Sequence, residues 1–270
     1  MCTTGVVRLA DGSYALFKNK DFGRAHLDDL LWIDGDRFGV MGMTTWAGDD
    51  PSLDEYSGFS IGANRHGLLC CDSNVVTLDG HQNYDVMTEV ALRHGTDVPT
   101  AVAAIRSACA AEATSWGNLI MIDRQGAAVV EVRGHDVAVT LVDGPTARSN
   151  HHLALGHHEL QEDHHTTELR LASAQRNLDR AVVLDDVFAL QAAHDDGATG
   201  VCNHSDLTTV YSYVLQMTSD GLRLHVVQGR PCSGSPRVTL PVPLGSAYSV
   251  SAAARFLADY PTANKRNAAA

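Results

Sequence analysis

Cysteine stands at position 2, directly after the initiator methionine, and this place in the chain gives it an unusual chemistry. Methionine aminopeptidase normally removes a methionine that precedes so small a residue, which would leave Cys2 with a free α-amine. Such an amine has a reference pKa of about 7.7–8.0 and a thiol one of about 8.5, so near neutral pH the amine can accept the thiol proton. Cys2 would then carry both the nucleophile and its base. The alternative is a small second residue without a catalytic role.

A carboxylate is expected beside this cysteine. A strand that starts near Cys2, a hairpin turn at Asp11 and Gly12, and a returning strand toward Phe22 would bring Asp21 back to the start of the chain. Asp21 could orient the Cys2 end there. The alternative is an aspartate that serves only a turn.

This pattern resembles the choloylglycine hydrolase family and its relatives, the penicillin V acylases and the acyl-coenzyme A:6-aminopenicillanic acid acyltransferases. Their shared pattern is an N-terminal Cys-Thr, an Asp-Gly turn and an Arg-Asn-x-Asp segment, which Cys2, Thr3, Asn19 and Asp21 match. The resemblance extends over roughly residues 2 to 232, and after residue 147 it is greatest to the acyltransferase branch. The further segments that carry it are 62–68, 148–151, 166–170, 200–204, 208–210 and 229–232.

The resemblance implies roles for further polar residues. Asp21 would accept a hydrogen bond from the Cys2 end, and Asn150 and Asn74 would donate to the oxyanion of the tetrahedral intermediate. Arg170 would be a fixed positive charge that favours the thiolate. Ordinary structural interpretations also exist, since Asn150 could cap a strand end and Arg170 could lie on a helix surface.

One residue departs from the family pattern. Lys18 stands where choloylglycine hydrolases carry an arginine adjacent to the catalytic cysteine. Lysine keeps the charge but lacks the planar fork that makes bidentate contacts, which argues against a substrate of the bile-salt type. The loops 46–56 and 79–84, which line the pocket in this family, do not name a substrate by their composition.

Alternating apolar residues between turn residues predict antiparallel strands, with helices inserted in blocks. Strands are expected over 5–9, 14–19, 39–45, 59–64, 68–73, 117–122, 127–133, 137–141, 208–217 and 221–228, and helices over 86–92, 97–113, 166–181 and 185–194. This order predicts an α+β layered domain. The resemblance implies a four-layer αββα sandwich, with one domain over 2–245 and a C-terminal helix and frayed tail over 246–270.

The charge balance argues against some partners. The chain has 20 Lys+Arg and 32 Asp+Glu, a formal charge of -12, which repels the phosphates of nucleic acids and anionic lipids. No secretory signal pattern and no run of about 20 apolar residues is present, so we expect a cytoplasmic protein without membrane partners and with its six cysteines reduced. Formation of a homo-oligomer is compatible with these observations.

These observations predict a cysteine N-terminal-nucleophile amidohydrolase that cleaves a linear, non-peptide acyl amide through a Cys2 thioester. We expect it to need no cofactor and no metal. The first alternative is an N-acyltransferase that passes the acyl group to an amine, because both reactions share the acyl-enzyme. The second is a non-catalytic metal-binding protein, built on the histidine pairs at 151–152, 157–158 and 164–165.

Overall fold

Two antiparallel sheets form the centre of the structure, a computed structural model that describes residues 1–23, 28–45, 55–75, 85–112, 116–156, 164–195 and 200–262. Within these ranges the first sheet has six strands in the order β10-β1-β2-β11-β12-β13. They are β1 (Cys2–Arg8), β2 (Tyr14–Phe22), β10 (Thr146–Arg148), β11 (Thr208–Thr218), β12 (Gly221–Gln228) and β13 (Val238–Pro241). The second sheet is β3 (Leu31–Ile33), β4 (Arg37–Thr45), β5 (Glu55–Asn64), β6 (Leu69–Asn74), β7 (Trp116–Ile122), β8 (Ala127–Arg133) and β9 (Asp136–Val142), in sequence order.

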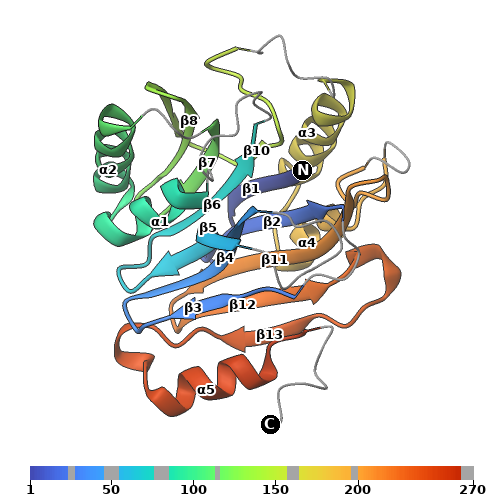
Figure 1. Ribbon diagram of the computed structural model, residues 1–270. Coiled ribbons are helices and arrows are strands. Elements are labelled where there is room, and N and C mark those ends of the chain that lie inside the picture. Colours follow the sequence, from blue (N-terminus) through green and yellow to red (C-terminus); the bar gives the residue numbers. More distant parts are fainter. Residues whose placement is uncertain are drawn as a thin grey trace.

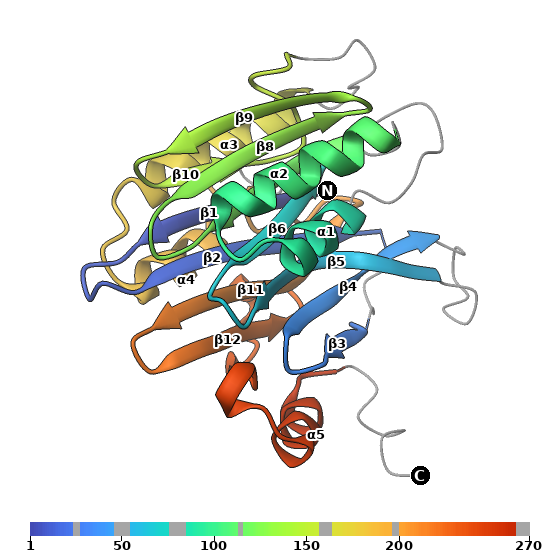
Figure 2. The same ribbon diagram turned by 90° about the vertical axis from the view of Figure 1, so that its left-hand side faces the viewer.

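Helices cover the outer face of each sheet, as Figures 1 and 2 show. Helices α1 (Asp85–His94) and α2 (Val98–Ala111) pack on the second sheet, and α3 (His164–Leu178) and α4 (Leu184–Gln191) pack on the first. A third apolar cluster fills the space between the two sheets. The predicted four-layer αββα sandwich is therefore confirmed. Helix α5 (Val250–Asp259) lies beside β13, and two single 3₁₀ turns, η3 (Pro231–Ser233) and η4 (Gly245–Ala247), complete the elements described.

Strand β2 shows how the sequence assigns one face to each neighbouring layer. Every residue of β2 is buried. Because side chains alternate along a strand, Leu16, Lys18 and Lys20 face the second sheet, while Phe17 and Asn19 face the helices. The interface between the sheets is thus apolar over most of its length and polar at the end where β1 begins. That end holds Cys2.

Helix α1 starts against the second sheet at a point that requires glycine. Its first residue, Asp85, lies so close to Gly42 and Gly58 that a Cβ atom on either glycine would overlap it. Gly58 also has a φ of 68°, a conformation that other residues rarely adopt. The two glycines therefore allow the helix to bring Asp85 to the polar end of the interface between the sheets.

Three of the strands lie outside the segments that the sequence predicts. They are β3, β10 and β13, which have three or four residues each and form edges of the two sheets. So short a strand has too few residues to show an alternating pattern. The C-terminal helix α5 places Phe256 against Phe38 in the cluster between the sheets, with ring centroids 5.4 Å apart. Residues 263–270 lie outside the described ranges.

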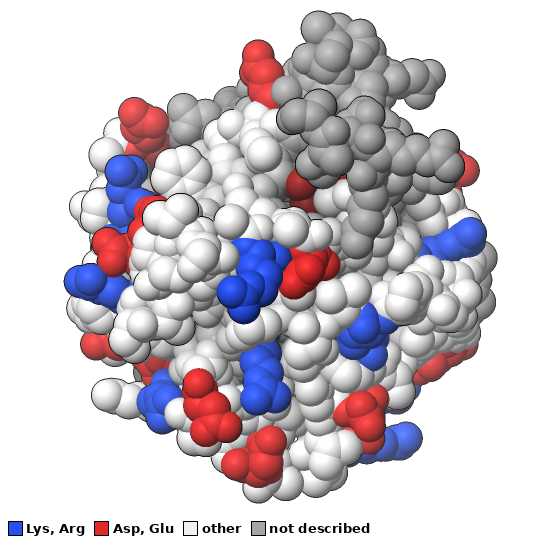
Figure 3. Space-filling model, turned by 90° about the horizontal axis from the view of Figure 1, so that it is seen from below, with Lys and Arg blue, Asp and Glu red and all other residues white. Residues whose placement is uncertain are grey.

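The surface mixes charges of both signs where Figure 3 shows it. On that face basic and acidic side chains alternate over the described residues rather than forming one large area of a single sign. None of the helices in the described part of the chain is long and apolar enough to cross a membrane.

Candidate active site

The chain begins inside the fold rather than on its surface. Cys2 is 6% exposed and pairs with Lys20 across β1 and β2. The pairing continues to the first residue, because the Met1 carbonyl accepts a hydrogen bond from the Asp21 backbone N–H at 2.8 Å, and the Met1 amine donates to the Asp21 carbonyl at 3.2 Å. The hairpin thus brings Asp21 beside Cys2, at the place that the sequence spacing predicts.

The carboxyl group of Asp21 is buried, and two residues hold it by hydrogen bonds. One lies in the loop before β11, and the other lies at the start of β11. Thr209 Oγ1 donates to the carboxyl group at 2.7 Å and Asn203 Nδ2 at 3.4 Å. Burial raises the pKa of Asp21, and the positive chain terminus, Arg170 and these two hydrogen bonds oppose that shift. Asp21 therefore places a buried carboxyl group beside the N-terminus of the chain.

Asn150 connects Cys2 to the neighbouring segments. Its Oδ1 accepts from the Cys2 backbone N–H at 3.2 Å and from Arg170 Nη2 at 2.9 Å, and its own backbone N–H donates to Thr167 Oγ1 at 2.8 Å. Its Nδ2 donates to the carbonyl and to the Oδ1 of Asn74, both at 2.8 Å. Asn150 and Asn74 therefore contact each other, and an oxyanion would compete with Asn74 for the amide N–H groups of Asn150.

Arg170 reaches the same point from helix α3 and is fully buried. Its Nη1 donates to the carbonyl of Cys2 at 3.2 Å and to Thr3 Oγ1 at 3.3 Å. Its position on the first turns of α3 therefore directs it inward, not into solvent. The structure brings together Cys2, Asp21, Asn150 and Arg170, and Asn74 through Asn150.

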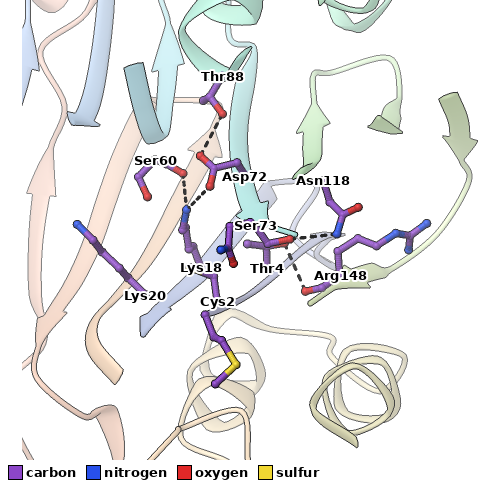
Figure 4. A network of polar contacts seen from close by, with 12 residues as sticks. Cys2, Thr4, Lys18, Lys20, Ser60, Asp72, Ser73, Thr88, Asn118 and Arg148 are labelled. Carbon is purple, nitrogen blue, oxygen red and sulfur yellow. Dashed lines mark hydrogen bonds and ion pairs between the residues drawn. The ribbon is translucent and has the colours of Figure 1, made fainter. Parts of the chain in front are cut away.

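Lys18 lies on the face of β2 that meets the second sheet, as Figure 4 shows. Its Nζ lies 2.8 Å from Asp72 Oδ1 and 2.9 Å from the carbonyl of Ser60, and both charged side chains are 1% exposed. Burial alone would lower the pKa of Lys18, but the Asp72 carboxylate is the largest opposing influence, and the net pKa is raised. Lys18 thus forms an ion pair with Asp72 between the two sheets, close to Cys2.

Asp72 has two further polar neighbours. Thr88 Oγ1 lies 3.4 Å from its Oδ2, and Asp85 lies close enough to interact with it. Burial and the charge of Asp85 raise the pKa of Asp72, whereas Lys18 lowers it. Lys18 therefore offsets the repulsion between two buried carboxyl groups.

A small cavity opens at the polar end of the interface. Its volume is about 30 Å³, which is too small for an acyl amide while Met1 is one of its walls. The cavity is lined by Met1, Cys2, Lys20, Asp21, Phe22, Met43, Ser60, Asn74 and Asp85. A larger cavity of about 560 Å³ lies at the other end of β1, but it includes none of the predicted site residues. Residues 46–54 and 79–84 of the expected pocket loops lie outside the described ranges.

Four residues of this region were not identified as site residues from the sequence. Lys20 lines the cavity, Asp72 pairs with Lys18, and Asn203 and Thr209 hold Asp21. Lys20 could have been found from its spacing of two residues from Lys18 on one strand. Asn203 and Thr209 belong to segments that carry the family resemblance, but their partner Asp21 is about 180 residues away in the sequence.

Of the three histidine pairs, the structure describes the side chains of the first only, and these belong to no cluster of metal ligands among the described residues. His151 and His152 are buried, and their ring nitrogens lie near Thr167 Oγ1 and the Gly117 carbonyl. His157 and His158 lie outside the described ranges. Cys70 and Cys71 point into different apolar clusters, so they pack on opposite faces of β6.

Two solved structures are similar to this chain in fold. No family model matches the chain, and no curated protein matches it by sequence. One solved structure similar to it is a variant of conjugated bile acid hydrolase from Clostridium perfringens, with 13% sequence identity and a TM-score of 0.52 over 93% of this chain and 100% of that one. A second variant of the same hydrolase has 14% identity and a TM-score of 0.50, over 92% and 99% of the two chains. The likeness establishes a shared αββα fold along nearly the whole chain.

We predict that Lys18→Met lowers the free energy of unfolding by about 3–5 kcal/mol at pH 7, because it leaves Asp72 buried without its partner. The pKa of Asp72 in the folded state is raised, so a proton taken up at lower pH relieves the loss. The deficit should therefore shrink as the pH falls toward about 4. Urea unfolding at several pH values measures it.

Arg65→Met is the matched control, since Arg65 pairs with Asp36 where both side chains are more than half exposed. It should cost no more than about 1 kcal/mol. The double variant Lys18→Met/Asp72→Leu should recover most of the lost stability. A Lys18→Met protein as stable as the unmodified one at pH 7, or a double variant no better than the single, would contradict this account of the ion pair.

Proposed function

We propose that this protein is a cysteine amidohydrolase that cleaves a linear acyl amide by way of a thioester on Cys2. The proposal rests on the contacts that surround Cys2 at the start of the chain. The backbone N–H of Cys2 faces Asn150 Oδ1, its carbonyl faces Arg170, and Asp21 lies on the neighbouring strand. A buried terminus with this many polar contacts is suited to chemistry on its first residue.

The reaction would begin once hydrolysis of the Met1–Cys2 peptide bond has produced a free α-amine on Cys2. That amine takes the proton from Sγ, and the thiolate forms a C–S bond with the carbonyl carbon of the substrate. The carbonyl oxygen becomes an oxyanion. The α-ammonium then gives its proton to the substrate nitrogen, the C–N bond breaks, and the amine product leaves. Water, deprotonated by the same α-amine, hydrolyses the thioester and releases the carboxylic acid.

The neighbouring charges support the attack of Cys2 on the carbonyl carbon. Arg170 and Lys18 are buried cations near Cys2, and both would stabilise the negative charge of the oxyanion. The contact of the Cys2 nitrogen with Asn150 Oδ1 fixes the direction of the α-amine. The Asn150 and Asn74 amides are the candidate donors to the oxyanion. Loss of Met1 would also remove one wall of the cavity and enlarge it at the nucleophile.

Acyl transfer to an amine is the second candidate function. It is favoured by the resemblance of segments 148–151, 166–170 and 200–204 to the acyltransferase branch. The same thioester would form, and an amine in place of water would attack it. Adding increasing amounts of an acceptor amine during turnover distinguishes the two, because a transferase would form the new amide at the expense of the free acid.

We predict that Asn150→Ala slows amide turnover by about 10²–10³ in kcat, because it removes an oxyanion donor and the acceptor that orients the Cys2 nitrogen. Steady-state kinetics with a panel of linear acyl amides measures the change. Asn177→Ala is the matched control, since Asn177 lies on α3 and contacts Ser173 and Asp195 instead. It should leave kcat unchanged. An effect of Asn150→Ala on KM alone would contradict its role.

The variants Cys2→Ser and Cys2→Ala separate the nucleophile from the rest of the site. We expect a trace of activity from serine, whose hydroxyl is much harder to deprotonate than a thiol, and none from alanine. Both should fold, because the loss of one sulfur at the start of a strand costs about 1 kcal/mol or less. Turnover and a thermal melt are measured for each, with Cys109→Ala as the control cysteine. Substantial turnover by Cys2→Ala with an unchanged melt would mean that another thiol carries the reaction, Cys202 being the first suspect.

A further inference from the structure

Four side chains with nitrogen and sulfur ligand atoms meet outside the candidate active site. They come from three segments: His194 follows helix α4, Cys202 and His204 lie in the loop before β11, and Cys232 lies in the turn η3. One ligand atom of each lies within 4.8 Å of all the others. None of the four lines the cavity at Cys2.

The separations within this cluster are close to those of a tetrahedral zinc site. The Sγ atoms of Cys202 and Cys232 are 3.5 Å apart, and His204 Nε2 lies 3.6 Å from the first and 3.1 Å from the second. Zinc bonds of about 2.3 Å to sulfur and 2.0–2.1 Å to nitrogen at tetrahedral angles require about 3.8 Å between sulfurs and about 3.6 Å between sulfur and nitrogen. Shifts of a few tenths of an ångström would therefore admit the ion.

The fourth side chain completes the set. The ring of His194 packs against that of His204 with centroids 4.6 Å apart, so its nitrogen is near the other ligand atoms. The two cysteines are free thiols, and their sulfur separation is well beyond a disulfide bond length of about 2.05 Å. Two thiolates and two imidazoles form a ligand set that suits zinc and is unsuited to magnesium or calcium.

We propose that His194, Cys202, His204 and Cys232 bind one zinc ion in a closed, structural Cys₂His₂ site. The two thiolates balance the charge of the ion, and His204 binds it through Nε2. His204 Nδ1 would then carry the imidazole proton, so Arg230, whose Nη1 lies 3.0 Å from that nitrogen, must turn away. Arg230 is exposed and free to do so. His194 and Cys232 are also exposed, which gives the ion a route into the site.

The site would fix a loop that supports the chain start. Cys202 and His204 flank Asn203, whose side chain donates to the Asp21 carboxylate. The backbone N–H of Cys202 donates to the Ala193 carbonyl at 3.1 Å, so the loop is already attached to the segment that carries His194. A metal that joins this loop to η3 would keep Asn203 directed at Asp21 without taking part in the reaction.

The first experiment measures metal content. Tag-free full-length protein, incubated with excess zinc and dialysed without chelator, is analysed by inductively coupled plasma mass spectrometry. We expect about one zinc per chain, and less than about one tenth in Cys232→Ser. Cys232 is exposed, so this variant should fold. Cys109→Ala, which removes a thiol outside the cluster, is the matched control and should keep the full amount.

The second experiment reports the ligands. Replacement of zinc by cobalt(II) should give the visible absorption of a tetrahedral cobalt ion together with thiolate-to-cobalt charge transfer. Both signals should disappear in Cys232→Ser and persist in Cys109→Ala. Equal metal content in Cys232→Ser and the unmodified protein would overturn the proposal, because the metal would then be bound elsewhere. A zinc-free protein would also overturn it, as would peptide mapping that finds a Cys202–Cys232 disulfide.

Discussion

A nucleophile that uses its own α-amine as base must be the first residue of the chain, and the fold then has to hold a chain terminus in one place. Termini usually fray unless other contacts tie them down. Here β1 lies between β10 and β2, and Cys2 is held at its nitrogen by Asn150 and at its carbonyl by Arg170. Asp21 follows Lys20, the residue that pairs with Cys2 across β1 and β2. Because these contacts involve backbone atoms, they would persist when the side chain of residue 2 is changed.

The second constraint is the polar end of the interface between the sheets. Buried charges are costly unless each has a partner, so the carboxylates and the cation there must be matched. Lys18 and Asp72 satisfy each other, and Asp85 reaches them because two glycines let helix α1 approach the sheet. The apolar remainder of the interface supplies stability, while the polar end would accommodate the charge that the proposed reaction develops beside Cys2. On the helix side of the first sheet, the proposed zinc site would hold Asn203 against Asp21.

The sequence predicts most of this architecture because long alternating strands and the period of the helices are local signals. It does not predict β3, β10 and β13, which are too short to show a pattern. The position of Asp21 beside Cys2 could be predicted since a single hairpin joins them. By contrast, the contact of Asn150 with Cys2 and the cluster of His194 with Cys232 join distant segments, and no local spacing indicates them. Only the Cys-x-His spacing at 202–204 is a local sign of that cluster. The direction of the Asn150 amide toward Asn74 depends on side-chain packing that the sequence does not reveal.

The most direct test is the mass of the N-terminal peptide after incubation of tag-free protein with a panel of linear acyl amides and an acid quench. We expect a peptide that begins at Cys2 and gains the mass of the acyl group on that residue. Hydroxylamine should remove the added mass, because it cleaves thioesters. Active protein that retains Met1 in full, or an acyl group found on any other residue, would contradict the central claim that Cys2 is both nucleophile and base.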